Sequence, residues 1–249
     1  MPEALRELSG AWNFRDVADG APMLRPGRLF RSGELSGLDD EAGFPTGSRC
    51  TCCPFPISAS TRPAPTTRRR TSTPSSGCSP ATGAEQSAES VDEAATRYMI
   101  DEYRQFPTRN GAQRALHRVI SLLGAGRAVL THCFAGKDRT GFVVATVLEA
   151  IGVDRDVIVA DFLRSNDAAP ALRAQISAMI AQRQDTELTP EVVTWTEARL
   201  SDGVLGVREE YLAAARQTID EKFGSLQAYL RDAGVGEADV QRLRAALLA

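Results

Sequence analysis

The sequence has no long hydrophobic run. None of its apolar stretches reaches the roughly 18 residues that a membrane-spanning helix needs, so we expect no integral membrane segment. Residues 1–3 do not begin a basic region followed by an apolar run, so no Sec-type signal peptide is expected. A net charge of −3 disfavours nucleic-acid binding. These absences predict a cytoplasmic protein, or one exported without a Sec-type signal.

Cysteine is scarce outside one segment. Of the five cysteines, four lie between residues 44 and 84, and Cys133 lies elsewhere. A single cysteine in the remaining chain is typical of a reduced compartment or of a protein that needs no disulfides. Internal repeats are also absent, which argues against a solenoid. With 43% apolar and 24% charged residues, the chain is predicted to form one domain over 1–249, interrupted at 44–84.

The most informative motif surrounds Cys133. Residues 132–140 read HCFAGKDRT, after a strand-like run at 128–131 and before apolar residues at helical spacing from Arg139 onward. A loop between a strand and a helix directs backbone N–H groups at one point, where the helix dipole also favours negative charge. The Cys-x5-Arg spacing in this setting therefore predicts the phosphate-binding loop of a cysteine-dependent phosphatase.

Two side chains of this loop carry the expected chemistry. Cys133 attacks phosphorus as a thiolate, because a helix N-terminus and cationic neighbours lower the pKa of a thiol. Arg139 offers a planar fork of donors that matches two phosphate oxygens and binds more tightly as charge develops in the transition state. A carboxyl group has to protonate the leaving oxygen.

The other loop residues are expected to bind phosphate or support the loop. Gly136 lets the backbone approach the phosphate oxygens without a Cβ clash, and Lys137 adds a point charge for further phosphate groups. Thr140 is expected to donate its hydroxyl to the Cys133 sulfur. The predicted phosphate-binding set consists of Phe134, Ala135, Gly136, Lys137 and Arg139.

Two assignments stay open at this point. Asp138 either protonates the leaving oxygen or pairs with Lys137 in a structural role. His132 either orients the loop by hydrogen bonding, which we favour, or acts as a base. No metal ligand is expected in the site.

The motif resembles that of the tyrosine phosphatase B family of mycobacteria and its bacterial relatives, which share HCxxGKDRT. The likeness extends to AWNFRDV at 11–17, RLFRS at 28–32 and DFLRSN at 161–166. It covers residues 5–43 and 86–249. The resemblance implies that Cys133 is the nucleophile and Arg139 the phosphate clamp, with Lys137 and Asp138 as the extra residues of a lipid-type signature.

The same resemblance implies the substrates. They are phosphotyrosine, phosphoserine or phosphothreonine, and phosphoinositides, hydrolysed through a phosphocysteine without a metal or other cofactor.

Two alternatives to this function stay open. An arsenate reductase or sulfurtransferase shares Cys-x5-Arg, but Lys137–Asp138 and residues 13–16 argue against it. A catalytically impaired chain would bind phosphate groups without turnover. The sequence does not rank phosphotyrosine against phosphoinositide or fix the oligomeric state.

Residues 44–84 differ in composition from the rest of the chain. They contain five arginines, no Asp or Glu, and no Leu or Val, so the segment carries +5 and the remainder −8. A stretch so poor in large apolar residues cannot offset the entropy of ordering. Three explanations compete: a disordered basic insertion, a metal site at Cys50, Cys52 and Cys53, and translation in the wrong reading frame. The abrupt change of composition favours the last, and the cysteine spacing disfavours the second.

This segment has a predicted structural consequence. The resembled family places an Asp-Leu-Arg segment on a strand between the N-terminal signature and the phosphate loop, and 44–84 contains none. We therefore expect the sheet to lose one or two strands and the site rim to lose candidate acid and orienting residues.

The rest of the chain is predicted to be mainly helical. Ser90 and Glu93 form a capping-box pattern that opens a helix ending before Pro107. Strand–helix alternation around one buried strand predicts an α/β layer fold, a cysteine-phosphatase-like parallel sheet flanked by many helices. An apolar stripe predicts a helix ending at Gly124, with Ala112, Leu116, Val119, Ile120 and Leu123 inward. Further helices are expected near 154–165, 170–183, 190–200, 208–223, 225–233 and 237–248.

Three roles outside the motif stay open or unassigned. The amphipathic helices between 170 and 223 are either core or a lid over the site. Asp161 and Arg164 either support the loop or line its rim, or they have a solvated or salt-bridged role. His117 has no assigned role.

Overall fold

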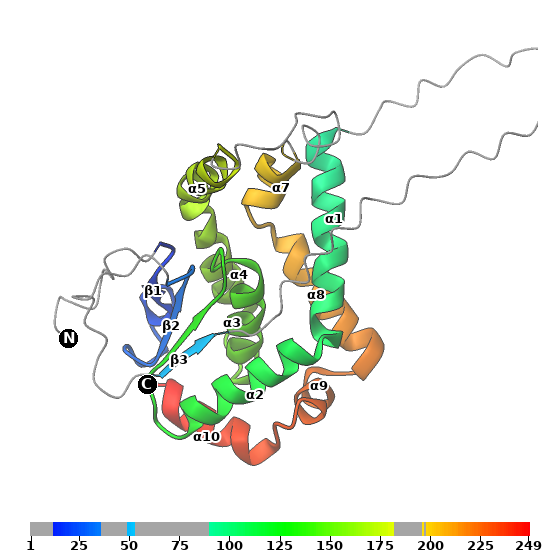
Figure 1. Ribbon diagram of the computed structural model, residues 1–249. Coiled ribbons are helices and arrows are strands. Elements are labelled where there is room, and N and C mark those ends of the chain that lie inside the picture. The colour runs from blue at the N-terminus through cyan, green and yellow to red at the C-terminus, as the bar shows by residue number, and fades with distance from the viewer. Residues whose placement is uncertain (1–11, 36–48, 53–89, 182–195, 197) are drawn as a thin grey trace, which may run out of the picture.

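The computed structural model describes residues 12–35, 49–52, 90–181, 196 and 198–249 (Figure 1). Its sheet has the strand order β1-β2-β4-β3, in which β2 and β3 run parallel to β4 and β1 runs antiparallel to β2. The central strand β4 therefore has a hydrogen-bonded neighbour on each side. The strands are β1 (Arg15–Asp16), β2 (Leu29–Ser32), β3 (Arg49–Cys52) and β4 (Val129–His132).

Strand β3 corrects one expectation. It lies within segment 44–84, which was predicted to deprive the sheet of strands, yet Arg49 pairs with Val129 and Cys52 with His132. Parallel pairing uses backbone N–H and C=O groups, which every residue except proline supplies. A segment without Leu or Val can therefore still form an edge strand. The predicted disorder, metal site and reading-frame error concern residues and side chains outside those described.

The first two helices follow the predicted pattern closely. Helix α1 (Val91–Gln105) opens with the expected capping box, in which Ser90 N donates to Glu93 at 2.8 Å and Glu93 N donates to Ser90 Oγ at 3.2 Å. Helix α2 (Asn110–Gly124) buries the whole predicted apolar stripe and ends at the predicted glycine. Local sequence signals therefore determined both elements.

The remaining helices agree with the predicted ranges to within a few residues, except that α7 was not predicted and that the range 190–200 lies mostly outside the described residues. Short 3-10 turns follow β1, α1 and α4. These elements are α3 (Asp138–Ala150), α4 (Arg155–Leu163), α5 (Ala169–Ala181), α7 (Asp202–Leu205), α8 (Glu209–Phe223), α9 (Leu226–Asp232), α10 (Glu237–Leu247), and the turns η2 (Val17–Gly20), η3 (Phe106–Thr108) and η4 (Arg164–Ala168).

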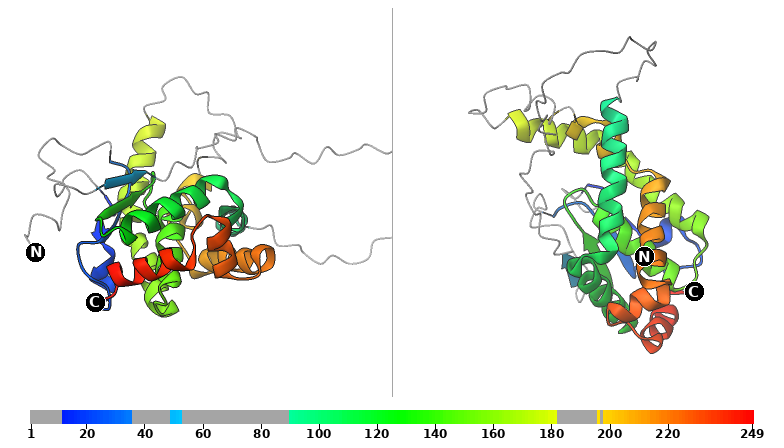
Figure 2. Two further views of the ribbon diagram at one scale, coloured as in Figure 1. Left: turned by 90° about the horizontal axis from the view of Figure 1, so that it is seen from below. Right: turned by 90° about the vertical axis from the view of Figure 1, so that its right-hand side faces the viewer.

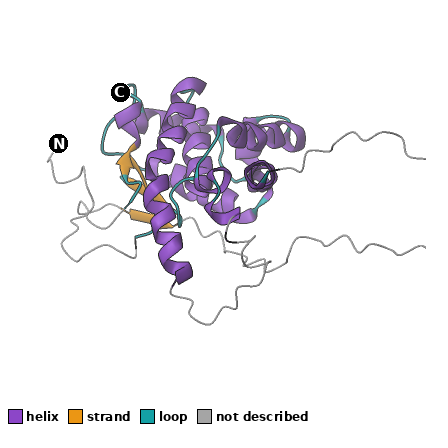
Figure 3. Cartoon of the chain, turned by 90° about the horizontal axis from the view of Figure 1, so that it is seen from above, coloured by secondary structure: helices purple, strands orange, loops and turns teal. Residues whose placement is uncertain are grey.

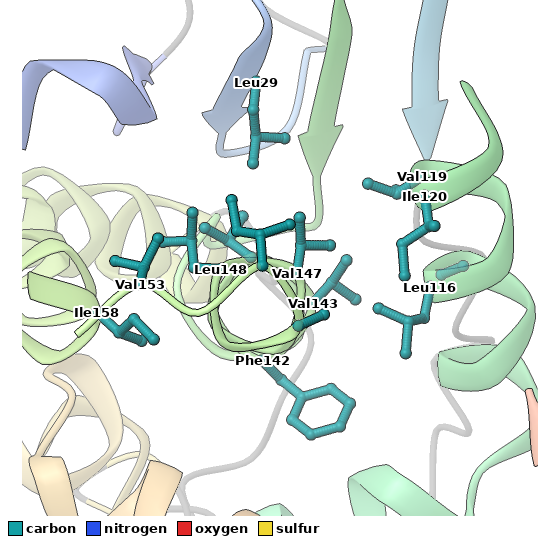
Figure 4. Packing of buried hydrophobic residues seen from close by; sticks show 14 of the residues in the cluster. Leu29, Leu116, Val119, Ile120, Phe142, Val143, Val147, Leu148, Val153 and Ile158 are labelled. Atoms are coloured by element: carbon teal, nitrogen blue, oxygen red, sulfur yellow. The ribbon is translucent and has the colours of Figure 1, made fainter. Parts of the chain in front are cut away.

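Helix α3 forms the centre of the core (Figure 4). Val147 and Leu148 point toward Leu29 of β2, while Phe142 points to the opposite side of the helix. A helix that is apolar on nearly all sides has to be buried, and each buried Val or Leu side chain contributes about 1.5–3 kcal/mol. This packing fixes the N-terminus of α3 relative to the end of β4.

The strands gather at one side of the molecule and the helices fill the rest (Figures 2 and 3). Helix α10 packs along α2, and the C-terminus is tied to the N-terminal segment because Arg25 N donates to Leu247 O at 2.7 Å. Ala249 N likewise donates to Met23 O at 3.0 Å. The predicted α/β fold is confirmed, with an antiparallel edge strand added to the parallel sheet.

Candidate active site

The motif loop joins the end of β4 to the start of α3. It runs from Cys133 to Lys137, and Asp138 begins the helix. Cys133 is buried, with 6% of its surface exposed, and is a free thiol. The first N–H groups of a helix have no partner within the helix and face whatever lies before it. The strand–loop–helix arrangement is thus the one that commonly binds anions.

Three successive carbonyl groups of this loop are hydrogen-bonded from outside it. Phe134 O accepts from Glu34 N at 3.0 Å, and Ala135 O accepts from Asn13 Nδ2 at 3.2 Å. Gly136 O accepts from Arg31 Nη2 at 2.9 Å. All three donors belong to the N-terminal segment 12–35.

These bonds also orient the N–H groups of the loop. In a trans peptide the C=O and N–H bonds point in opposite directions, and the described residues contain no cis peptide. Carbonyls that face the N-terminal segment therefore direct the N–H groups of Ala135, Gly136 and Lys137 away from it. Three of the predicted phosphate-binding residues thus present their N–H groups on one side of the loop.

A buried ion cluster lies behind the loop. Asp161 Oδ1 accepts from Arg15 Nε at 2.9 Å, and Asp161 Oδ2 accepts from Arg31 Nη1 at 2.6 Å. The exposed fractions are 2% for Asp161, 8% for Arg15 and 0% for Arg31. The salt-bridged alternative for Asp161 is therefore confirmed, and a solvated or rim position is wrong, because its carboxylate is enclosed by guanidinium groups in the interior.

The cluster carries a net positive charge. Burial raises the pKa of Asp161, but Arg31 and Arg15 outweigh that effect and hold it below its ordinary value. Burial, together with Arg31, lowers the pKa of Arg15 to about 10, so its guanidinium stays charged at neutral pH. Two buried cations beside one carboxylate favour an anion at the neighbouring loop.

Lys137 is directed into the protein. Its side chain is 5% exposed, and Nζ donates to Asp138 Oδ1 at 2.6 Å and to Gly206 O at 3.2 Å. Tyr103 OH also donates to Asp138 Oδ1, at 3.0 Å. Burial and Asp138 raise the pKa of Tyr103 well above its ordinary value, so the hydroxyl remains a donor. Of the two alternatives for Asp138, the structure contains the ion pair with Lys137.

The Lys137 side chain does not point in the direction that its expected role, binding further phosphate groups, requires. An ammonium group bonded to Asp138 and to the residue after α7 does not extend toward further phosphate groups. The contact instead joins the loop to the connection between α7 and α8. Roles of Lys137 toward phosphate and of Asp138 as an acid stay predictions.

The structure gives a further reason for glycine at position 136, and the predicted approach to phosphate oxygens stays a prediction. Its φ of +64° lies in the left-handed region, and a Cβ would lie 2.5 Å from Gly33 N. This crowding comes from the end of β2. Glycine is the residue that tolerates both constraints.

The three remaining predicted residues, His132, Arg139 and Thr140, belong to the same motif as Cys133. Thr140 is buried, and its hydroxyl has no hydrogen-bond partner in the described part of the chain, so the expected bond to the Cys133 sulfur is not formed here. Catalytic hydrogen bonds often tighten only when substrate binds, so that role stays a prediction. Burial and the charge of Arg139 lower the pKa of His132, which is half-buried. This favours a neutral imidazole.

Helices α5 and α7 cover the loop. Ala135 forms a small apolar cluster with Leu172 of α5 and Leu205 of α7, against which Trp12 and Phe134 also pack. The Trp12 and Phe134 rings meet edge to face at 6.2 Å. The first half of α5 is therefore packed as part of the site wall, and the lid alternative stays a prediction.

Sequence reasoning did not assign site roles to Asn13, Arg15, Arg31 and Tyr103. The first three belong to motifs that carried the family resemblance, NFRD and RLFRS, and that was the available signal. Tyr103 had none, because it reads as an ordinary core residue of α1. Within the described ranges no group of His, Cys, Asp and Glu side chains could hold a metal. No described helix is long and apolar enough to span a bilayer.

The sequence of this chain is similar to those of several known proteins. A model described as "Tyrosine phosphatase family" matches residues 54–249. The "Triple specificity protein phosphatase PtpB" of Mycobacterium tuberculosis is 60% identical over 277 residues, covering 98% of this chain and 99% of that protein. A Nostoc commune protein named "Tyrosine-protein phosphatase" is 31% identical over 127 residues, covering 48% of this chain and 39% of that protein.

A further relative comes from Cupriavidus necator and is also named as a tyrosine-protein phosphatase. It is 37% identical over 153 residues, covering 61% of this chain and 50% of that protein. The alignment with the M. tuberculosis protein spans 277 positions, whereas the chain has 249 residues, so at least 28 positions face gaps in this chain.

Proposed function

The chain belongs to the tyrosine phosphatase family, and on that premise we propose that it hydrolyses phosphate monoesters through a phosphocysteine at Cys133. Membership rests on the family match over residues 54–249 and on 60% identity across 98% of the chain. The chain is accordingly a phosphatase that acts on phosphorylated substrates. One observation carries the mechanism. The carbonyls of Phe134, Ala135 and Gly136, next to the buried Cys133, all face the N-terminal segment 12–35, so that the N–H groups of the same peptides face away from it.

In the first step the Cys133 thiolate attacks phosphorus and forms an S–P bond, while the bond from phosphorus to the ester oxygen breaks. The N–H groups of Ala135, Gly136 and Lys137 bind the non-bridging oxygens. Arg139 binds two of them as a fork. These donors are fixed before the reaction and stabilise the charge that develops in the transition state. The leaving oxygen takes its proton from a carboxylic acid.

In the second step water attacks the phosphocysteine. The S–P bond breaks, inorganic phosphate leaves, and the sulfur departs as a thiolate. A hydroxyl that donates to sulfur makes the thiolate a better leaving group, which is the proposed role of Thr140. His132 keeps the end of β4 in place and, as a neutral imidazole, adds no positive charge that would compete with Arg139.

The substrate range is proposed from the M. tuberculosis relative, whose name describes triple specificity. We propose that this chain dephosphorylates phosphotyrosine, phosphoserine or phosphothreonine, and phosphoinositides. The loop binds a phosphate group common to all of them. The three classes therefore differ in how the alcohol reaches the loop rather than in the phosphoryl chemistry.

A second candidate function is phosphate binding without turnover. Two observations favour it: Asp138 is already bonded to Lys137 and Tyr103, and at least 28 aligned positions face gaps in this chain. An enzyme without its acid expels aryl oxides more readily than alkyl oxides, because an aryl oxide leaves without protonation. A chain that lacks only its acid would therefore still hydrolyse aryl phosphates, which distinguishes it from a chain that binds phosphate without turnover.

The deciding experiment measures hydrolysis of p-nitrophenyl phosphate by the full chain, with vanadate and Cys133→Ser as controls. Vanadate-sensitive turnover that the variant lacks supports the proposed mechanism. Binding of a phosphotyrosine peptide without phosphate release, by a folded preparation, supports the second candidate. Comparison with a phosphoserine peptide then tests whether a working acid is present.

A further inference from the structure

The hydrogen-bond donors to two of the three loop carbonyls, those of Ala135 and Gly136, are both linked to the carboxylate of Asp161. Asp161 binds Arg31, which donates to Gly136 O at 2.9 Å. Asp161 also binds Arg15, whose Nη1 donates to Asn13 Oδ1 at 2.6 Å. Asn13 in turn donates to Ala135 O at 3.2 Å. Two hydrogen-bonded arms thus run from the two oxygens of Asp161 to adjacent peptide groups of the loop.

Each arm has a fixed geometry. Both guanidinium groups also contact Ser165 Oγ, Arg31 at 3.1 Å and Arg15 at 3.4 Å, and Arg15 Nη2 donates to the Asp161 carbonyl at 2.6 Å. Planar guanidinium groups held by several acceptors have little freedom to rotate. Asn13 adopts a φ of +55°, which Asn tolerates better than most residues. The side-chain amide is therefore aimed at the loop by backbone and by Arg15 together.

We propose that Asp161 is a positioning residue for the reaction, acting through Arg31 on one peptide group of the loop and through Arg15 and Asn13 on the preceding one. This inference rests on the proposed function. The two peptide groups carry the N–H groups of Lys137 and Gly136, which bind the phosphoryl oxygens. Misaligned donors weaken transition-state binding more than substrate binding, so the effect falls mainly on kcat.

A merely structural cluster makes a different prediction. Its loss would lower stability and the yield of folded protein, but each folded molecule would turn over at the normal rate. The two possibilities separate when kinetics are measured well below the unfolding temperature of every variant.

The test uses three variants of the full chain. Asn13→Gly tolerates the positive φ and removes only the arm to Ala135. Arg31→Lys keeps the charge but lacks the fork that reaches Asp161 and Gly136 O together. Asp161→Asn releases both arms. Each variant is assayed for kcat and KM with p-nitrophenyl phosphate, for vanadate affinity by calorimetry, and for thermal unfolding.

We expect kcat and vanadate affinity to fall about 10- to 100-fold in each variant, with KM within about twofold of the wild type. Asn13 and Asp161 are linked through Arg15, which bonds both of them. If Asn13 acts on the loop independently of Asp161, the effects of the two substitutions on kcat should add. The positioning account predicts that Asn13→Gly costs less in the Asp161→Asn background than in the wild type, because the arm is already released there.

The matched control is Leu243→Ala, which empties a fully buried position of α10 against α2, away from the loop. It should lower the unfolding temperature while leaving kcat unchanged. Folded variants with kcat and vanadate affinity within about twofold of the wild type would overturn the inference. If Asp161→Asn does not fold, Asn13→Gly and Arg31→Lys decide it alone.

Failure of the proposed function gives a separate result. A wild type that binds vanadate without turnover refutes the hydrolysis, and vanadate affinity of the same variants then decides the positioning inference. Loss of that affinity in Asn13→Gly and Arg31→Lys supports it, and unchanged affinity overturns it.

Discussion

Replacing Asp161 by Asn should destabilise the protein more than replacing Arg31 by Met. The wild-type cluster holds two cations and one carboxylate, all at least nine-tenths buried. Asp161→Asn leaves two buried guanidinium groups without a counter-charge. Removing one partner from a buried ionic group costs about 3–5 kcal/mol. For a domain of this size, that corresponds to a fall in Tm of about 6–20 °C.

The smaller effect of Arg31→Met follows from the same charges. It leaves Arg15 and Asp161 as a neutral pair, so its main cost is the Gly136 carbonyl that loses its donor. An unsatisfied buried acceptor costs about 1–3 kcal/mol. A methionine side chain fills most of the vacated volume, and removing a cation from a positive cluster offsets part of the loss.

Urea denaturation at neutral pH, followed by circular dichroism, measures the free energy of unfolding of both variants. Arg216→Met is the matched control, because Arg216 pairs with Glu149 at 2.6 Å while about a third of each side chain is exposed. It should change the free energy of unfolding by no more than about 1 kcal/mol. An Asp161→Asn variant as stable as the control, or more stable than Arg31→Met, would refute the reasoning.

Three further predictions concern the loop. Cys133→Ser should abolish turnover and keep phosphopeptide affinity within about tenfold, since it removes the nucleophile but not the N–H donors; binding lost together with turnover, measured by calorimetry, would contradict this. Gly136→Ala should lower the free energy of unfolding by about 1–2 kcal/mol from its φ of +64° alone, with more from the crowding against Ser32–Gly33; a urea titration that matches the wild type would show the reasoning to be wrong. Burial and Arg139 lower the pKa of His132, so the unfolded state binds a proton more readily and stability should fall as the pH drops below about 6.5. His132→Gln should lose that part of the acid dependence, and denaturation curves at several pH values that keep it would refute the assignment.

The sequence determined the local features of this protein. The capping box at Ser90, the buried stripe of α2 and the Cys-x5-Arg spacing before α3 are each encoded within a few turns of chain. Side-chain spacing and cap chemistry act over that distance whatever the rest of the molecule does. The α/β fold and the place of the phosphate loop could therefore be predicted from the sequence.

The tertiary structure decided which groups meet. Arg15 and Asp161 lie 146 positions apart, and no periodicity or spacing relates them. The direction of Lys137 depends on Gly206, 69 positions away, and the strand at Arg49–Cys52 depends on an open edge of β4. Such contacts form when whole elements pack, since a buried charge or a backbone donor accepts whichever partner the fold brings within reach. The sequence determined the atoms of the phosphate loop, and the fold determined the groups that hold them in place.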